Sequence, residues 1–368
     1  MNIPFLSFQK MNMQVKAEVL TSFESFFISS RYILGERVEQ FEKEYAMFNN
    51  TQYCVGVANG LDALIIALKT LNIGKGDEVI VPSNTYIASW LAVSHVGATP
   101  VPVEPRIDTF NINIDLIENA ITSRTKAIMP VHLYGQCSEM EAIMEIAKKH
   151  NLFVVEDNAQ SQGATFNGKI AGSFGHINGT SFYPGKNLGA FGDAGAITTN
   201  QEDWSTRAAL IRNYGSFRKY YNEELGINSR LDEIQAGFLT IKLKYLQEWN
   251  KERNVAAQQY LERLLQCQGV TLPLLANGAT SVYHLFVIRT GQRDSLQEYL
   301  KGKGVGTLIH YPVPPHLQKA YISLSYQKGD FPIAEKMADT CLSLPMFPGL
   351  SENEIDYICD AINKFFNG

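Results

Sequence analysis

Short apolar runs alternate with longer amphipathic segments through the first two hundred residues. The apolar runs, which predict strands, occupy residues 53–58, 78–81, 99–103, 125–131 and 152–155. Between them, apolar residues recur at helical spacing over 36–48, 61–71, 86–96, 114–121 and 140–150. The strand-like runs are continuous rather than alternating, which is typical of strands buried on both faces. The pattern therefore predicts an α/β fold in which helices cover a largely parallel sheet.

The pattern changes after Asp232, where a long helical stretch continues to Leu265. We interpret this stretch as one helix that leaves a first domain and enters a second. Apolar runs at 283–289 and 305–310 and a final amphipathic helix over 352–366 complete the chain. We expect a large domain of residues 1–245 and a smaller C-terminal α+β domain of residues 246–368.

Charge and cysteine content narrow the classes of partner. The formal net charge of -5 comes from 32 basic and 37 acidic residues that are interspersed, which disfavours nucleic acid and anionic membranes as partners. No run approaches the ~20 apolar residues of a membrane span. The five cysteines are far apart and odd in number, which predicts reduced cytosolic thiols and no metal site. We therefore expect a cytoplasmic protein.

Two candidate chemical groups lie where predicted strands end. Ligands of parallel sheets collect at the carboxyl ends of the strands, and the run at 152–155 leads directly into Glu156, Asp157 and, three residues later, Gln160. Lys186 follows Asp157 by 29 residues (186 − 157), about the length needed to return to the same edge. We expect Asp157 and Lys186 to form a catalytic pair, although Glu156 and Asp157 could each also be a helix cap or a surface charge.

Glycines surround Lys186 and also open a predicted helix. The segment 179–196 has glycines at 185, 189, 192 and 195, which allow close approach of the backbone to a ligand. On its own, this segment fits a surface turn with a solvated lysine equally well. Gly60 and Leu61 begin the helix predicted at 61–71, where free amides can hold a phosphate, although an ordinary turn gives the same pattern.

Three motifs, in order along the chain, carry a resemblance to a known family. They are Glu-Asp-Asn-Ala-Gln at 156–160, Ser-Phe-Tyr-Pro-Gly-Lys-Asn-Leu-Gly at 181–189, and Gly-Ile-Asn-Ser-Arg-Leu-Asp-Glu-Ile-Gln-Ala at 226–236. Together they resemble the DegT/DnrJ/EryC1/StrS family of sugar aminotransferases, and the similarity runs from about residue 31 to residue 349. The resemblance implies an aspartate aminotransferase-like fold (PLP fold type I) and pyridoxal 5'-phosphate (PLP) as cofactor.

The resemblance also implies roles for single residues in holding the cofactor. Lys186 matches the lysine that forms a Schiff base with the cofactor and later moves a proton. Asp157 matches the carboxylate beneath the pyridine nitrogen, and Gln160 matches a hydrogen-bond partner of the ring oxygen. Tyr86 stands where an aromatic side chain stacks on the ring, although a tyrosine at a helix start is also a common core residue.

The phosphate contacts that the resemblance implies involve two subunits. Gly60, Leu61 and Ser181 match the phosphate cup, and Asn228 matches an asparagine that reaches the phosphate of the neighbouring subunit. A homodimer with shared active sites is therefore expected. The chain departs from the common family pattern at Gln162, where relatives often have histidine, and at Leu61, where a threonine or serine often donates its hydroxyl.

On the substrate side, the resemblance implies L-glutamate as donor and a nucleotide-linked keto sugar as acceptor. The chain looks most like enzymes that aminate dTDP-3-keto-6-deoxyhexoses, which make deoxyamino sugars for surface polysaccharides such as lipopolysaccharide O-antigen or for glycosylated metabolites. Candidate substrate contacts are Tyr183, Arg218, Tyr221, His310 and Tyr311. The segment 213–221, which mixes positive charge with aromatic residues, also fits a solvated loop.

Three other functions remain open at this point. Amination at carbon 4 of a 4-keto sugar uses the same scaffold and differs mainly in how the sugar lies over the cofactor. Some relatives are PLP-dependent sugar dehydratases, but those lack the Schiff-base lysine, so Lys186 argues for transamination. A non-catalytic regulatory relative would keep the fold without turnover, and the intact set of Lys186, Asp157 and Gln160 argues against it.

Overall fold

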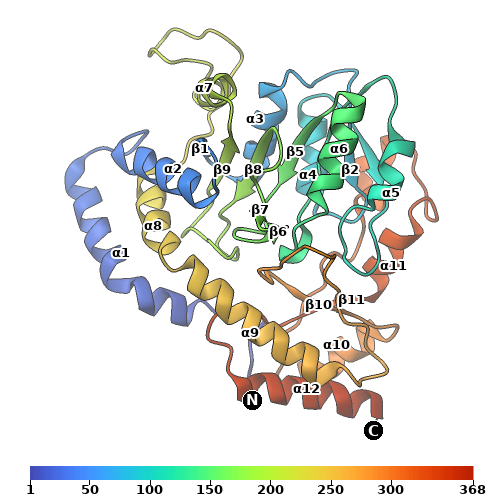
Figure 1. Cartoon of the computed structure of the whole chain (residues 1–368). Coiled ribbons are helices and arrows are strands. Elements are labelled where there is room, and N and C mark those ends of the chain that lie inside the picture. The colour runs from blue at the N-terminus through green and yellow to red at the C-terminus, as the bar shows by residue number, and fades with distance from the viewer. Residues whose placement is uncertain (368) are drawn as a thin grey trace.

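A seven-stranded sheet forms the centre of the computed structural model, which describes residues 1–367 (Figure 1). The strand order is β1 (Tyr53–Val57), β9 (Gly195–Thr199), β8 (Ile177–Ser181), β5 (Phe153–Asp157), β4 (Thr125–Ile128), β2 (Glu78–Pro82) and β3 (Thr99–Val103). Neighbouring strands are parallel except at β9, which runs antiparallel to both β1 and β8. The predicted largely parallel sheet is thus confirmed, with one reversed strand.

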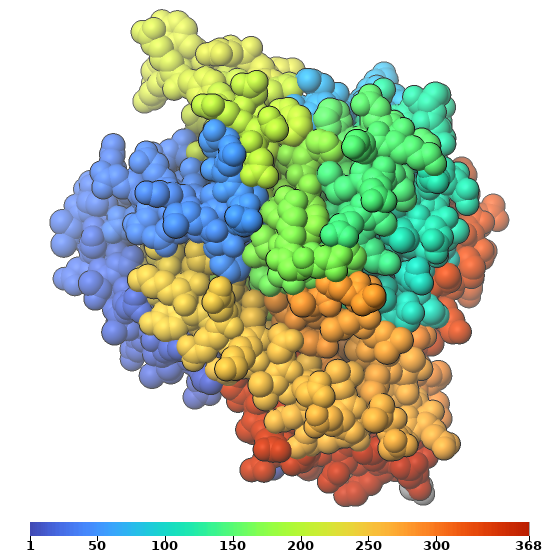
Figure 2. All heavy atoms as spheres, in the orientation of Figure 1, coloured from blue at the N-terminus to red at the C-terminus, as the bar shows by residue number. Residues whose placement is uncertain are grey.

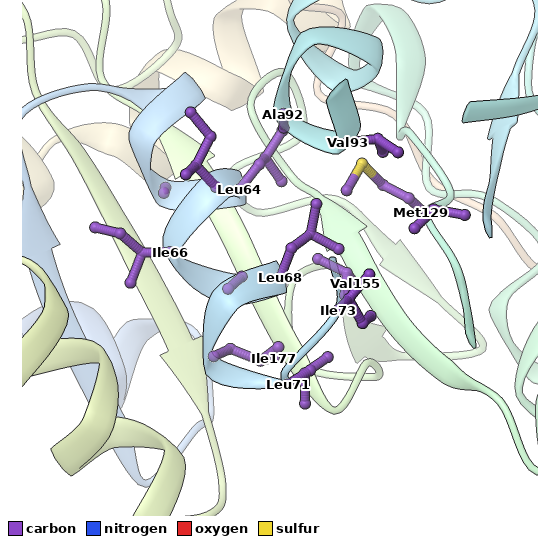
Figure 3. Packing of buried hydrophobic residues seen from close by; sticks show 14 of the residues in the cluster. Leu64, Ile66, Leu68, Leu71, Ile73, Ala92, Val93, Met129, Val155 and Ile177 are labelled. Carbon is purple, nitrogen blue, oxygen red and sulfur yellow. The ribbon is translucent and has the colours of Figure 1, made fainter. Parts of the chain in front are cut away.

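Helices cover both faces of this sheet. They are α2 (Glu36–Phe48), α3 (Gly60–Thr70), α4 (Ile87–His95), α5 (Ile114–Ile117), α6 (Met140–His150) and α7 (Glu202–Ile211). The apolar side chains of α3, among them Leu64 and Leu68, pack with Val155 and Ile177 in the largest buried cluster (Figure 3). A Cβ atom at Gly179 would lie 2.7 Å from Leu64 Cδ2, so α3 sits directly on β8. This close packing places the first turn of α3 beside the end of β8.

Several predicted boundaries differ from the structure. The single helix expected after Asp232 is wrong, because it breaks into α8 (Glu233–Leu243) and α9 (Leu246–Leu264). At the break, the Tyr245 hydroxyl donates to Glu18 Oε1 at 2.6 Å on α1 (Gln9–Ser29), a helix that the pattern did not predict. Met11 and Val15 of α1 are buried, whereas Met13, Leu20 and Phe27 are exposed, so apolar side chains lie on both sides of the helix and do not form one clear stripe.

The remaining elements are short or belong to the C-terminal part. The expected helix at 114–121 is one turn of α5 followed by the 3-10 turn η1 (Glu118–Ala120), and the run at 305–310 forms only isolated bridges to Ile3 and Ser343. The other short elements are η2 (Leu133–Gly135), β6 (Thr165–Phe166), β7 (Lys169–Ile170), η3 (Pro315–Leu317) and η4 (Lys319–Leu324).

A second buried cluster lies in the C-terminal part of the chain. There β10 (Phe286–Arg289) pairs antiparallel with β11 (Cys341–Leu344), beside α10 (Arg293–Gly302), α11 (Pro332–Thr340) and α12 (Glu352–Asn367). The cluster joins side chains of α9, α10 and α12 to this small sheet, and it also includes Ile3 from the N-terminal end. The division into residues 1–245 and 246–368 stays a prediction, since the first residues pack with the C-terminal part.

The molecular surface has one prominent extension. The segment between α7 and α8, drawn yellow-green, projects from the upper edge of the molecule (Figure 2). It exposes several large apolar side chains, and so does α1 on the outside of the molecule. Within residues 1–367, no helix is long and apolar enough to cross a membrane, and no group of three or more His, Cys, Asp or Glu side chains is placed to hold a metal ion.

Candidate active site

The adjacent strands β5 and β8 bring the predicted acid and the lysine turn to one edge of the sheet. Asp157 is the last residue of β5 and pairs with Gly179 of β8, whose strand ends two residues later at Ser181. The Asp157 carboxylate is 5% exposed; it accepts hydrogen bonds from Ser89 Oγ at 2.8 Å and from the Ala159 amide at 3.2 Å. Burial raises the pKa of Asp157, while these two hydrogen bonds and the charge of Lys186 oppose the rise.

Lys186 lies in the turn that links β8 to β9. Its amide donates to Tyr183 O at 2.8 Å, and the Ala190 amide closes the turn by donating to Phe182 O at 2.8 Å. Burial lowers the pKa of Lys186 to about 8, although the negative charge of Asp157 acts in the opposite direction. The amine is therefore partly neutral near physiological pH, as a nucleophile or a proton carrier requires.

The start of α3 and the end of β8 form a site suited to a phosphate. A Cβ atom at Gly60 would lie 2.5 Å from Ser181 Cβ, so Ser181 is in contact with the first turn of the helix. Ala63 makes the first intrahelical hydrogen bond, to Asn59 O at 3.1 Å, and the Asp62 amide donates to the Asn59 side chain at 2.8 Å. The amides of Gly60 and Leu61 precede these bonds and remain available to an anion.

Aromatic and amide side chains from both parts of the chain meet near this edge. The rings of Tyr86 and Tyr311 are 5.2 Å apart, and Gln160 Nε2 donates to the Tyr311 hydroxyl at 3.1 Å. Gln160 Oε1 accepts from the Tyr134 amide at 2.7 Å, which leaves this side chain firmly oriented. Burial, and next the charge of Lys186, lower the pKa of His310 to about 4, so its imidazole is neutral at physiological pH.

A single chain does not bring all of the predicted residues together. Arg218 and Tyr221 lie in the projecting segment, where the guanidinium carbon is 4.4 Å from the centre of the tyrosine ring. Asn228 is exposed, but its neighbour Ser229 accepts a hydrogen bond from the Ala58 amide at 3.1 Å, close to the start of α3. Tyr183, in the lysine turn itself, is 58% exposed.

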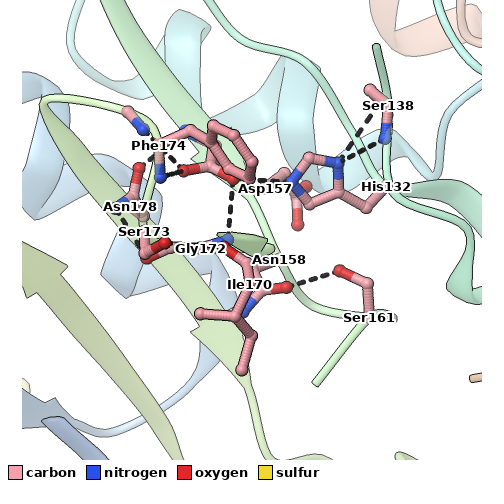
Figure 4. Close-up of polar contacts among 12 residues, drawn as sticks. His132, Ser138, Asp157, Asn158, Ser161, Ile170, Gly172, Ser173, Phe174 and Asn178 are labelled. Carbon is pink, nitrogen blue, oxygen red and sulfur yellow. Dashed lines mark hydrogen bonds and ion pairs between the residues drawn. The ribbon is translucent and has the colours of Figure 1, made fainter. Parts of the chain in front are cut away.

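Buried polar contacts of Glu156 surround the end of β5, and its partners His132, Gly172 and Phe174 are labelled in Figure 4. The fully buried Glu156 carboxylate accepts from the amides of Gly172, Phe174 and Gly175 and is 2.7 Å from His132 Nε2. Glu156 therefore orders the strand end, while Asp157 is the acid whose charge acts on Lys186. His132 is a buried core residue with no exposed surface.

The structure assigns contacts to two supporting side chains whose partners the sequence did not indicate. Ser89 holds Asp157 from α4, yet a serine in a helix carries no pattern that links it to a strand 68 residues away. Gln162 is fully buried and donates from Nε2 to Ser181 O at 2.8 Å and to Thr180 Oγ1 at 3.3 Å. In this chain the glutamine therefore braces the end of β8, beside the candidate phosphate site.

Known proteins match this chain over nearly its full length. The model of the DegT/DnrJ/EryC1/StrS aminotransferase family matches residues 13–363. A dTDP-3-amino-3,6-dideoxy-alpha-D-galactopyranose transaminase from Aneurinibacillus thermoaerophilus is 51% identical over 363 residues, which are 99% of this chain and 99% of the relative.

Solved structures show the same architecture. The crystal structure of DesV from S. venezuelae matches with a TM-score of 0.98 and 46% identity, over 100% of this chain and 99% of DesV. NtdA from Bacillus subtilis, whose structure contains the bound cofactor PMP, matches with a TM-score of 0.92 and 32% identity, over 100% of this chain and 86% of NtdA. These likenesses confirm the predicted aspartate aminotransferase-like fold.

Proposed function

Because the chain belongs to the DegT/DnrJ/EryC1/StrS aminotransferase family, we propose that it transfers an amino group from L-glutamate to carbon 3 of a dTDP-linked 3-keto-6-deoxyhexose. The single observation that carries the chemistry is Lys186, with a lowered pKa, opposite the buried Asp157 at one sheet edge. The relative from Aneurinibacillus thermoaerophilus, named for a dTDP-3-amino sugar, supports the choice of sugar and of carbon 3. The product would be a deoxyamino sugar for a surface polysaccharide or a glycosylated metabolite.

The enzymes of this family depend on PLP, and the residues at the sheet edge fit that cofactor. A Cβ at Gly60 would collide with Ser181, so only glycine leaves room for a phosphate to approach both the hydroxyl of Ser181 and the amides of Gly60 and Leu61. The buried Asp157 carboxylate suits a protonated ring nitrogen, since a buried anion needs a positive partner. When bound, PLP supplies an aldehyde that takes up amino groups and a ring that withdraws electrons.

Each remaining residue then has a definite task around the ring. Lys186 would hold the cofactor through its amine and, once released, would carry a proton between the substrate carbon and the cofactor carbon. Tyr86 would cover a face of the ring, and the Gln160 amide would donate to the ring oxygen. His310 is neutral and can accept or donate a hydrogen bond with its free nitrogen to the sugar, since Nδ1 already lies 2.8 Å from Ser343 Oγ. Tyr183 and Tyr311 would contact the substrate as well.

The proposal also includes a homodimer in which each site takes residues from both chains. In a single chain, the segment that carries Arg218 and Tyr221 projects from the upper edge of the molecule (Figure 2), which supports a role in the site of a second copy. Asn228 is exposed and would reach the phosphate of the neighbouring subunit. The outer face of α1 supports the same conclusion, because it exposes Met13, Leu20, Phe23, Phe27 and Ile28.

The decisive experiment follows the cofactor and then the product. The protein is purified with PLP, its visible absorbance is recorded, and L-glutamate is added; we expect the band to shift to the amine form of the cofactor. Lys186→Ala is the control, and it should not turn over. An unchanged spectrum, or a protein without cofactor, would refute transamination and favour a regulatory protein.

The sugar is then identified with synthetic dTDP-3-keto and dTDP-4-keto hexoses. We expect nitrogen at carbon 3, read by NMR of the product. Nitrogen at carbon 4 would establish the 4-aminotransferase instead, and loss of a hydroxyl without gain of nitrogen would establish a dehydratase.

Mixed dimers test whether the sites are shared. Lys186→Ala and Asn228→Ala chains, each inactive or weak alone, are unfolded together and refolded. If sites are shared, a mixed dimer has one site with both native residues, and activity returns. If activity does not return although mixed dimers form, each site is complete within one chain.

A further inference from the structure

We propose that Lys242 is a positioning residue, which holds the turn that carries Lys186 through a hydrogen bond to the backbone. This inference rests on the proposed function, because it concerns the same lysine. Lys242 lies in the last turn of α8 and is 7% exposed. Its Nζ donates to Gly189 O at 2.6 Å and lies 3.7 Å from the centre of the Phe191 ring. Both partners belong to the turn between β8 and β9.

The absence of an acidic partner makes this buried ammonium unusual. Within residues 1–367, Lys242 forms no ion pair, whereas its neighbour Lys244 is exposed and pairs with Glu18 at 3.2 Å. A buried lysine is rarely retained unless it is paired, because the loss of hydration is costly. Here the Gly189 carbonyl and the face of the Phe191 ring replace a carboxylate, and burial lowers the pKa of Lys242 to about 8. Both of these contacts of the buried Lys242 side chain are with the lysine turn.

Gly189, which accepts the hydrogen bond from Lys242, lies where the two ends of the lysine turn pack together. A Cβ atom at Gly189 would lie 2.2 Å from Pro184 O, so the chain after Lys186 packs tightly on the chain before it. The hydrogen bond from Lys242 attaches Gly189, and with it this close contact between the two parts of the turn, to α8. Lys186 lies inside the closed segment, and its position relative to the sheet depends on how firmly this contact is held.

A second contact from the same helix strengthens the attachment. Gln235 Oε1 accepts a hydrogen bond from the Phe191 amide at 2.9 Å, and Gln235 precedes Lys242 by two helical turns on the same face. The helix therefore binds the turn on both sides of Ala190. Its own place is fixed by Glu233, which accepts hydrogen bonds from the amides of Gly35 and Val38 at the start of α2. Lys186 is in this way positioned from the body of the large sheet domain.

The test compares four variants with the wild type. Lys242→Met keeps most of the length of the side chain but removes the donor and the charge, whereas Lys242→Arg keeps the donor and the charge. Lys244→Met is the matched control, with the same charge change two residues away on the exposed surface. Gln235→Leu removes the second contact and leaves Lys242 in place, so it remains informative if Lys242→Met does not fold. Each protein is loaded with PLP, and the visible circular dichroism of the bound cofactor is recorded beside kcat and KM for L-glutamate.

We expect Lys242→Met to lower kcat about tenfold, with KM changed much less, and to alter the circular dichroism, because the lysine amine is misplaced while the donor still binds. Lys242→Arg should recover most of the loss, Gln235→Leu should show a smaller loss of the same kind, and Lys244→Met should behave as wild type. Lower thermal stability of Lys242→Met and Gln235→Leu with unchanged kcat and circular dichroism would overturn the inference. Failure of the wild type itself to respond to L-glutamate would instead refute the proposed function.

Discussion

The titration of Lys186 is the most direct quantitative consequence of the site. In the protein without cofactor, capture of PLP by Lys186 requires the neutral amine. A pKa of about 8 leaves about one amine in ten neutral at neutral pH, whereas the ordinary value of 10.5 would leave about one in three thousand. The lowered pKa of the half-buried Lys186 therefore increases the reactive fraction about 300-fold.

The sign of the pH dependence follows from the same shift. Deprotonation produces the reactive form, so the rate of PLP capture should rise with pH and level off above a midpoint of about 8. The charge of Asp157 raises the pKa of Lys186, and Asp157→Asn should consequently move the midpoint to lower pH.

Stopped-flow absorbance of the apo-protein mixed with PLP measures this rate across the pH range. Lys186→Ala under the same conditions reports the slower reaction of other lysines, including Lys242, whose pKa is also about 8. A midpoint near the ordinary lysine value, or a rate that Lys186→Ala reproduces, would show that burial does not activate this amine.

Three further perturbations test the site and its support. Asp157→Asn should keep PLP bound but lower kcat about 100-fold, because the partner of the ring nitrogen loses its charge; steady-state kinetics decide, and near wild-type turnover would rule out the role. Gly60→Ala should weaken PLP binding and cost about 1–3 kcal/mol of stability in urea unfolding, since its Cβ meets Ser181, whereas Gly291→Ala, in open space, should do neither. Glu233→Ala leaves the amides that start α2 without their acceptor and should lower the free energy of unfolding by about 2 kcal/mol. PLP affinity, measured on the same variant, separates an effect on stability from an effect on function.

Local patterns in the sequence were enough to locate the main chemical groups. A strand buried on both faces is a continuous apolar run, so the run before Asp157 could be recognised without any contact information. The glycines around Lys186 and at Gly60 mark places where a side chain would fill the space a ligand needs. These short-range signals predicted β1 to β5 and the meeting of Asp157 and Lys186 at one sheet edge, whereas β8 and β9 were not predicted.

Contacts between distant segments were decided only by the tertiary structure. β9 runs antiparallel to both β1 and β8. The composition of the β9 segment does not indicate in which direction the strand runs. Ser89 reaches Asp157, and Lys242 reaches Gly189, across 68 and 53 residues of chain. From the sequence, a serine or a lysine within a helical pattern is predicted to lie on the surface, and only the packing of the helix shows that it is buried. The sequence by itself thus determined which groups meet at the edge of the sheet, while the packing of α4 and α8 determined how those groups are held, because burial and hydrogen-bond geometry exist only once the helices are docked.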